Sequence, residues 1–163
     1  MPSAKPYVVL IDGKSGVGKS SLANVIAAHL GATVVHLDDV YPGWDGLESG
    51  RDSVIESVLE PISAGLPGRI QTWDWHRNIA GEVVAVNRAD SIVIEGCGIS
   101  TPRSRSLAST VIWLECSEPE RQRRLFGRDG DAFSDYLEAW DRQVDSHIAR
   151  NDPVATATVI VRT

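Results

Sequence analysis

The residues best suited to chemistry lie at positions 13–21, where the chain reads GKSGVGKSS. Gly13, Gly18, Lys19 and Ser20 fall at the spacing of the phosphate-binding pattern G-x-x-x-x-G-K-[ST]. In this pattern backbone N–H groups cradle phosphates, the lysine reaches the β- and γ-phosphates, and the hydroxyl ligates Mg²⁺. We therefore expect this loop to bind ATP, with Lys19 as a catalytic residue. The residues expected to contact the nucleotide are Gly13, Lys14, Ser15, Gly16, Val17, Gly18, Lys19, Ser20 and Ser21.

The segments on either side of the loop support this interpretation. Residues 7–11 (YVVLI) form a continuous apolar, β-branched run that is typical of a strand buried on both faces of a parallel sheet. Residues 22–30 (LANVIAAHL) carry apolar side chains at helical spacing and are followed by Gly31, which suits a helix C-cap. A loop between a strand and a helix is the context that the pattern requires. A glycine-rich turn that binds nothing is the alternative.

Carboxylates follow two other strand-like runs. Residues 33–37 (TVVHL) precede Asp38 and Asp39, and residues 91–94 (SIVI) precede Glu95. Because ligands bind outside the carboxyl ends of parallel strands, these acids are expected beside the phosphate loop. Either aspartate can deprotonate an acceptor hydroxyl, and Glu95 can hold Mg²⁺ through water. The expected metal ligands are Ser20, Asp39 and Glu95. The alternatives are a turn cap for the aspartates and a solvated strand end for Glu95.

Basic residues cluster at positions 121–128, in a segment of helical character that begins at Ser117. Mobile cations in such a segment can meet the charge of a transferring phosphoryl group. A solvated helix face is the alternative for one or two of them. The four candidates are Arg121, Arg123, Arg124 and Arg128.

Aromatic residues gather in two loop-like segments and indicate the acceptor side. Flat rings suit stacking against a planar acceptor, although packing in the core is an equal alternative for each tryptophan. The rings are Tyr41, Trp44, Trp73 and Trp75. Asp74, His76 and Arg77 could bind hydroxyls or a phosphate, with a structural hydrogen bond as the alternative for His76. The remaining histidines, His29, His36 and His147, are interpreted as helix or strand residues without partners.

The remaining pattern predicts the fold class. Strand-like runs at 110–114 and 158–161, and helical stripes over 51–64 and 133–148, alternate with the segments above. This alternation predicts an α/β fold of three layers, with a five-stranded, mainly parallel sheet flanked by helices. Segments 70–75 and 82–86 could be strands that cover a site. We expect one domain over residues 1–163, with a substrate-covering segment at about 38–80 and an arginine lid at about 121–131.

Composition restricts the partners. A net charge of −6 over 163 residues argues against nucleic acid or an anionic membrane as the main partner, because both need clustered Lys and Arg. Cys97 and Cys116 lack metal-ligand spacing and are expected to be reduced residues in the core or near the site. No apolar run approaches the length of a membrane span. We expect a cytoplasmic monomer or homodimer.

Four segments in this order resemble the uridine kinase-like group of P-loop small-molecule kinases: GKSGVGKSSLA, HLDDVYPGW, VIEGCG and RQRRLFGRD. The group includes uridine-cytidine kinase, nicotinamide riboside kinase, pantothenate kinase and phosphoribulokinase. The resemblance implies that Asp38 is the catalytic base, that Tyr41 takes the family's aromatic position and that Arg124 and Arg128 belong to a lid. It also implies that residues 73–77 (WDWHR) combine elements near the acceptor. No clear copy of the family's nucleoside-specific hairpin is visible.

The sequence therefore predicts a phosphotransferase that moves the γ-phosphoryl of ATP, with Mg²⁺, to a hydroxyl of a small acceptor. A nucleoside is the preferred acceptor, and Asp38, Tyr41, Trp44, Asp74, His76 and Arg77 are expected to bind it. Lys19, Asp38, Arg124 and Arg128 are expected to be catalytic, and Arg124 also to contact the nucleotide. Two alternatives remain: a sensor or regulatory protein that binds ATP or ADP without efficient transfer, and a kinase for a nucleoside monophosphate or another metabolite.

Overall fold

The main sheet has five strands in the order β2-β5-β1-β6-β7, and every neighbouring pair is parallel. The computed structural model describes residues 5–87 and 91–163. The strands are β1 (Tyr7–Asp12), β2 (Thr33–His36), β5 (Ser91–Glu95), β6 (Thr110–Glu115) and β7 (Val159–Arg162). The five predicted runs are therefore confirmed, and the carboxyl ends of β1, β2 and β5 carry the acids and the phosphate loop.

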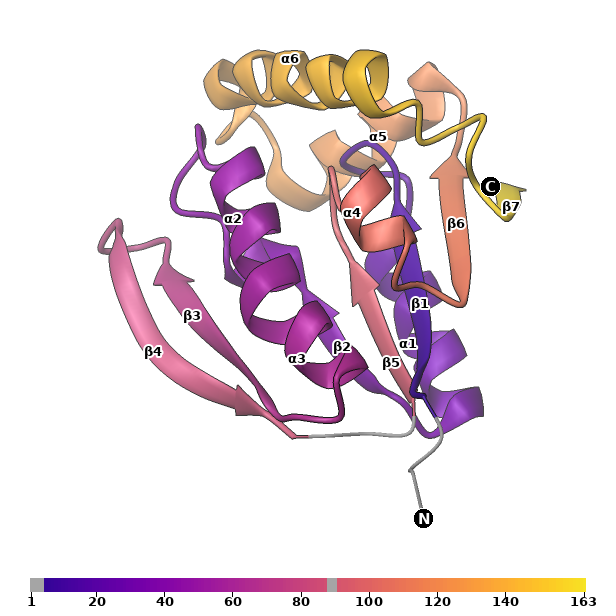
Figure 1. Ribbon diagram of the computed structural model, residues 1–163. Helices are drawn as coiled ribbons and strands as arrows, with labels where there is room; N and C mark the ends of the chain where they lie inside the picture. The colour runs from indigo at the N-terminus through magenta and orange to yellow at the C-terminus, as the bar shows by residue number, and fades with distance from the viewer. Residues whose placement is uncertain (1–4, 88–90) are drawn as a thin grey trace.

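Helices cover both faces of the sheet and complete the predicted three layers (Figure 1). Side chains of β1 alternate between the faces. Val9 and Ile11 pack in a cluster with Ala23 and Ala27 of α1 (Lys19–Leu30). Val8 and Leu10 belong to a second, larger cluster on the opposite face, with residues of the helical segment after β2. Both faces of β1 are therefore buried, which explains its unbroken apolar sequence.

The helical segment after β2 begins earlier than predicted. It consists of α2 (Leu47–Val54), the π-helical turn η2 (Ile55–Leu59) and α3 (Glu60–Ser63), which follow one another without a break. The apolar stripe predicted only residues 51–64, because the preceding turn contains Glu48, Ser49 and Gly50, which carry no apolar signal. Between β2 and α2, the short 3-10 helix η1 (Leu37–Asp39) carries both candidate aspartates.

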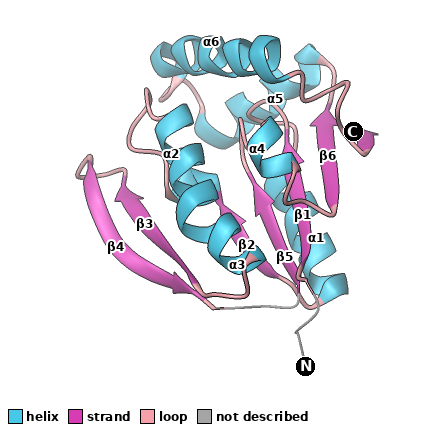
Figure 2. Cartoon of the chain, in the orientation of Figure 1, coloured by secondary structure: helices cyan, strands magenta, loops and turns pink. Residues whose placement is uncertain are grey.

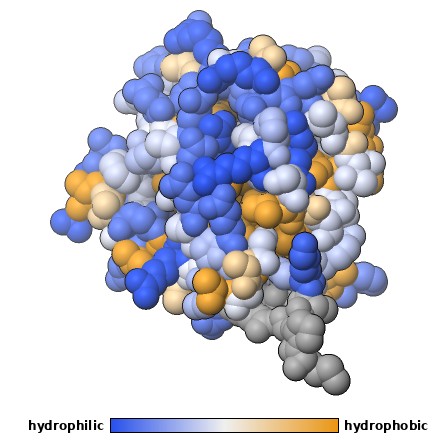
Figure 3. Space-filling view, in the orientation of Figure 1, coloured by the Kyte–Doolittle hydropathy of each residue, from blue (hydrophilic) through white to orange (hydrophobic). Residues whose placement is uncertain are grey.

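A separate antiparallel hairpin stands at one side of the main sheet (Figure 2). It pairs β3 (Gly68–Asp74) with β4 (Ile79–Val86). The segments at 70–75 and 82–86, which the sequence indicated as possible strands, are both confirmed as strands. Apolar patches lie over this hairpin at the left of the space-filling view (Figure 3), and its exposed apolar side chains include Val83 and Val84.

The last long helix lies across the carboxyl ends of the main strands (Figure 1). It is α6 (Ser134–Asn151), preceded by α5 (Glu118–Asp129), whose N-cap is Ser117 as predicted. The short helix α4 (Pro102–Arg105), capped by Thr101, was not predicted, since four residues carry no readable periodicity. In residues 5–87 and 91–163 no helix is long and apolar enough to cross a membrane.

Candidate active site

A cavity of about 670 Å³ opens at the carboxyl edge of the sheet, where the phosphate loop, η1, the hairpin turn, α5 and α6 meet. Its walls combine a polar half around the loop and an aromatic half beneath α6. The lining residues are Ser15, Gly16, Gly18, Lys19, Ser20, Ser21, Asp38, Tyr41, Trp44, Trp75, His76, Glu95, Cys97, Arg124, Leu125, Arg128, Phe133 and Trp140. Most of the residues expected from the sequence therefore surround one space. The expected residues that do not line it are Gly13, Lys14, Val17, Asp39, Asp74 and Arg77.

The phosphate loop has a backbone that only glycine can provide at two positions. Gly16 has φ +84°, and a Cβ there would lie 2.8 Å from Leu125 Cγ. Gly18 has φ +99° and is the N-cap of α1, so the loop runs directly into the positive end of the helix dipole. Backbone N–H groups at such a helix N-terminus favour bound anions. The loop thus has the geometry that the motif predicts.

Lys19 is buried and spans the mouth of the loop. Its Nζ donates to the carbonyl oxygen of Lys14 at 2.8 Å and lies 3.5 Å from Cys97 Sγ. Burial alone would lower the pKa of Lys19, but the neighbouring groups of Cys97, Glu95, Asp38 and Asp12 raise it above the ordinary value. Burial raises the pKa of the Cys97 thiol. Lys19 therefore keeps its positive charge although it is buried.

Glu95 is buried rather than solvated. Its Oε1 accepts hydrogen bonds from Ser20 Oγ at 2.9 Å and from His36 Nδ1 at 2.6 Å. The interpretation of His36 as a residue without a partner is therefore wrong. A hydroxyl beside a carboxylate is an oxygen donor set that suits Mg²⁺, which keeps several waters and takes further ligands from substrate phosphates. No cluster of three or more His, Cys, Asp or Glu within the described parts of the chain could hold a metal by itself.

The two candidate aspartates differ in position. Both are exposed, but only Asp38 lines the cavity. The backbone carbonyl of Asp38 accepts a hydrogen bond from Trp75 Nε1 at 2.8 Å, which ties η1 to the hairpin turn. The structure therefore places the Asp38 side chain beside the phosphate loop and leaves Asp39 outside the cavity lining.

Of the four arginines, only Arg124 and Arg128 line the cavity. Arg124 Nη1 donates to the carbonyl of Val17 at 3.1 Å, and Arg128 pairs with Asp129 at 2.6 Å. The interpretation of Arg121 and Arg123 as cations for the site does not hold. Arg121 is only 3% exposed and is bound by Glu118 and Asp141. Arg123 does not line the cavity and pairs with Glu120.

The half of the cavity that was expected to bind the acceptor is a cluster of aromatic rings centred on Trp44. Its ring stacks on Tyr136 with centroids 5.1 Å apart and meets Trp75 and Phe133 at 5.3 Å each. Tyr41 is buried, packs edge-on against Trp140 and donates its hydroxyl hydrogen to the carbonyl of Cys97 at 2.8 Å. Tyr41 and Trp44 thus line the cavity, as expected, but they also form part of the core.

The hairpin turn contributes only part of the predicted set. Trp75 and His76 line the cavity. Asp74 instead accepts hydrogen bonds through Oδ1 from the backbone N–H groups of His76 and Arg77, both at 3.0 Å, which fixes the turn. Trp73 also lies outside the lining, and its Nε1 is buried with no hydrogen-bond partner among the described residues. The structure therefore gives Asp74 a role in the turn rather than in the acceptor pocket.

Sequence reasoning missed several residues of the site. Phe133 and Trp140 wall the acceptor side, but their spacing signalled only a helix that packs against the core. Asp12 is completely buried behind the loop and accepts hydrogen bonds from the backbone N–H groups of Gly13 and Gly98. Its place between an apolar strand and the first glycine of the motif was the available signal.

No family model and no curated protein sequence matches the chain. Solved structures do match it, and they show its fold, which is shared with structures that are named as small-molecule kinases. A possible uridine kinase from Bacillus stearothermophilus superposes with a TM-score of 0.69 at 19% identity, over 98% of this chain and 90% of that one. The predicted uridine kinase-like fold is thereby confirmed.

Two further structures extend the likeness. A candidate fructose transport system kinase from Silicibacter sp. TM1040 gives a TM-score of 0.63 at 18% identity, over 98% of this chain and 91% of the other. Shikimate kinase from Acinetobacter baumannii, in complex with shikimate, gives 0.56 at 14% identity, over 98% and 84%. These neighbours share one fold and have names that denote kinases for different small molecules.

Proposed function

We propose that this chain is an ATP-dependent, Mg²⁺-dependent small-molecule kinase that phosphorylates a hydroxyl of a planar, nucleoside-like acceptor. One observation carries the proposal: a single cavity holds the phosphate loop, the carboxylate of Asp38, two arginines and an aromatic wall. A protein that only senses nucleotide needs the loop but has no use for a carboxylate and an acceptor pocket on its far side.

The nucleotide phosphates are held by the phosphate loop, with Lys19 against the β- and γ-phosphates. Ser20 and Glu95 hold Mg²⁺, which offsets phosphate charge when bound. Glu95 acts through Ser20, whose hydroxyl already donates to it. Arg124 and Arg128 exchange their present partners, the Val17 carbonyl and Asp129, for the oxygens of the transferring group.

Transfer needs one proton acceptor on the acceptor side. Asp38 takes the proton of the acceptor hydroxyl, and the hydroxyl oxygen bonds to the γ-phosphorus of ATP. The bond from that phosphorus to the bridging oxygen breaks at the same time, and ADP leaves. Asp38 suits this role because its side chain lines the cavity between the loop and Trp75. The positive charge of Lys19 and the two arginines meets the charge that spreads over the phosphoryl oxygens.

The acceptor is proposed to lie against the exposed faces of Trp75 and Phe133, with His76 at its edge. Aromatic walls stack planar rings and give little to a flexible alcohol. Uridine and cytidine are the first candidates. Arg77 lies outside the cavity lining, so among the described residues the cations that line the cavity are Lys19, Arg124 and Arg128.

The test is a screen of ADP release at fixed ATP and Mg²⁺ against nucleosides, nucleoside monophosphates, sugars and vitamins. Stimulation by a nucleoside, lost in Asp38→Asn, supports the proposal. Stimulation only by a non-planar alcohol would keep the kinase and remove the nucleoside. ATP binding without stimulation by any acceptor would favour the sensor.

A further inference from the structure

The carboxylate of Asp12 is buried behind the phosphate loop and is surrounded by donors. Its Oδ1 accepts from the backbone N–H groups of Gly13 at 2.7 Å and Gly98 at 2.9 Å. Its Oδ2 accepts from the backbone N–H of Ser100 and from His147 Nε2, both at 2.9 Å. One side chain thus joins the first glycine of the phosphate loop to the loop after β5, which carries Cys97 against Lys19.

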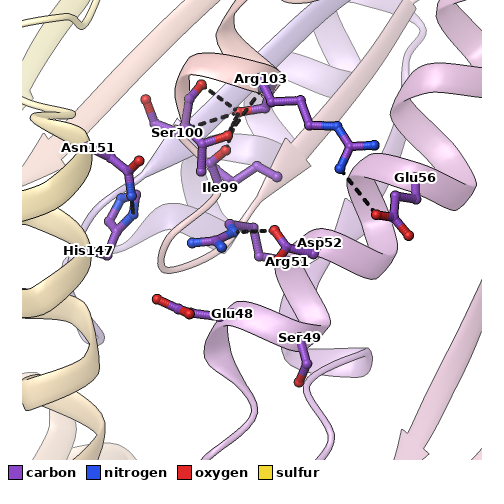
Figure 4. Close-up of polar contacts among 12 residues, drawn as sticks. Glu48, Ser49, Arg51, Asp52, Glu56, Ile99, Ser100, Arg103, His147 and Asn151 are labelled. Carbon is purple, nitrogen blue, oxygen red and sulfur yellow. Dashed lines mark hydrogen bonds and ion pairs between the residues drawn. The ribbon is translucent and has the colours of Figure 1, made fainter.

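His147 is the only side chain among these donors, and it is itself fixed. Its other ring nitrogen, Nδ1, lies 3.0 Å from Asn151 Nδ2. Because the amide nitrogen only donates, Nδ1 accepts and the ring proton lies on Nε2, facing Asp12. Figure 4 shows His147 and Asn151 projecting from α6 toward Ser100. The side chains of Asp12 and His147 are both fully buried, so water does not compete for the hydrogen bond between them.

Helix α6 also reaches the loop at two further points. Lys14 pairs with Asp145 at 2.6 Å, and Arg121 bridges Asp141 at 2.6 Å to the carbonyl of Ser15 at 3.2 Å. Both contacts are more exposed than the pair of Asp12 and His147, since Asp145 and Lys14 are partly in solvent. The buried pair is therefore the contact that water replaces least readily.

We propose that His147 is a positioning residue: by orienting Asp12 it fixes Gly13 and the loop after β5, and so preorganises the phosphate loop for nucleotide. Without the imidazole N–H, the buried carboxylate keeps three backbone donors and lacks its one side-chain anchor to α6. The carboxylate then turns toward a better-satisfied orientation and carries the Gly13 N–H with it. The remaining N–H groups of the loop lose their alignment with the phosphates.

The effect on nucleotide affinity rests on the proposed function, whereas the effect on loop order does not. The two are therefore measured separately. Hydrogen exchange of residues 13–20 is followed in the nucleotide-free protein, and the ATP dissociation constant is measured by titration in the presence of Mg²⁺. If wild type fails to bind ATP, the proposed function fails, and the exchange data alone decide this inference.

The variants are His147→Leu, which keeps volume without the donor, and His147→Gln, whose Nε2 reaches the place of the imidazole Nε2. Leucine should speed exchange in residues 13–20 and weaken ATP binding, each by about tenfold, and glutamine should restore both to within about threefold of wild type. The matched control is Val144→Ala, a buried α6 side chain whose core cluster includes no residue of the phosphate loop at positions 13–20. It should lower the melting temperature and change neither quantity.

Two outcomes would overturn the proposal. One is unchanged exchange and ATP affinity in His147→Leu, and the other is an equal effect of Val144→Ala at matched loss of melting temperature. If His147→Leu does not fold, Asn151→Ala decides, because it frees the ring to rotate and leaves the donor in place. It should speed loop exchange by about threefold, and exchange identical to wild type would reject the role of the pair.

Discussion

The two halves of the cavity are built by different interactions. On the phosphate side, hydrogen bonds and ion pairs fix nearly every group: Asp12 holds Gly13, and Glu95 holds Ser20. On the acceptor side, rings pack against one another, with Trp44 at the centre of four aromatic contacts. Hydrogen bonds are directional, so they hold the backbone groups of the phosphate loop in positions that suit one ligand shape. Ring packing is less directional and sets only the volume of the pocket, which a few substitutions can change.

This difference explains why one fold accommodates kinases for different acceptors. The phosphate side must meet the same triphosphate in each of them, so its backbone geometry is constrained. The aromatic half is assembled from residues 38–44, the hairpin turn and residues 133–140, three segments far apart in sequence. Substitution in any of them alters the pocket without disturbing the loop. The predictions below test whether the two halves are as separable as their construction indicates.

The largest effect is expected on the phosphate side, from Lys19→Ala. The ammonium stabilises charge that grows as the phosphoryl group transfers, so its loss should lower kcat by about 10³-fold or more. The fold should survive, because within residues 5–87 and 91–163 Nζ makes one backbone hydrogen bond and one thiol contact. Steady-state ADP release and circular dichroism measure both. Turnover within tenfold of wild type on folded protein would contradict the prediction.

Asp38→Asn tests the border between the halves. Loss of the proposed proton acceptor should lower kcat by about 10² to 10⁴-fold with the ATP dissociation constant unchanged, because in the proposed mechanism Asp38 contacts the acceptor hydroxyl and makes no bond to the nucleotide. Asp39→Asn is the matched control and should stay within about threefold, since Asp39 does not line the cavity. If Asp39→Asn is the inactive variant, the register of the base is wrong by one residue.

Arg121→Ala tests how strongly α5 and α6 support the phosphate side. Removing this buried guanidinium leaves Asp141 partly buried and unpaired, so the free energy of unfolding should fall by about 2–4 kcal/mol. Arg123→Ala, two residues further along α5 and exposed, should change it by less than about 0.5 kcal/mol. Urea denaturation of both variants measures the difference in the free energy of unfolding. Equal losses would mean that the buried ion pairs of Arg121 stabilise the fold no more than the exposed pair of Arg123.

The ion pair of Arg121 with Glu118 predicts a pH dependence of stability. Hydrogen bonding to Arg121 lowers the pKa of Glu118 from 4.5 to about 2. A carboxyl with a depressed folded pKa adds stability above its unfolded pKa and loses it as the pH falls toward the folded one. Wild type should therefore lose stability between about pH 4.5 and 2 in part through Glu118. The contribution is small because Glu118 is exposed. In Arg121→Ala the pKa should return toward 4.5, which an NMR titration detects.

The sequence predicted the phosphate side well because its information is local. Short apolar runs indicated the five strands, and a motif whose glycines have positive φ angles indicated the loop. The start of α5 at Ser117 was likewise visible in a few residues. It predicted the acceptor side only in part. Phe133 and Trp140 have the spacing of a core stripe, and no local signal states that a core stripe also walls a cavity. The partners of His36 and His147 lie 59 and 135 residues away, so their buried contacts have no signature along the chain.

The smallest effect is expected on the acceptor side, from Trp75→Ala. Its ring is 38% exposed at the cavity wall, so stacking with a planar acceptor should contribute about 1–2 kcal/mol, or about tenfold in the acceptor KM. The ATP KM should not change, because the indole hydrogen bond in the described part of the chain goes to the Asp38 backbone carbonyl and not to the phosphate loop. In wild type, binding of a planar acceptor should quench tryptophan fluorescence, and the variant should lose part of that change.

Arg77→Ala is the control for this last comparison, because Arg77 shares the hairpin turn with Trp75 but does not line the cavity. It should leave the KM for uridine within about twofold, and a loss equal to that of Trp75→Ala would mean that the turn, rather than stacking, sets acceptor affinity. If Trp75→Ala instead raises the ATP KM as much as the acceptor KM, the η1 contact couples the halves, and they are not separable. A change confined to the acceptor KM would show that the ring packing can be altered without disturbing the phosphate loop. This is the expected result, because separate hydrogen bonds hold the phosphate loop in place.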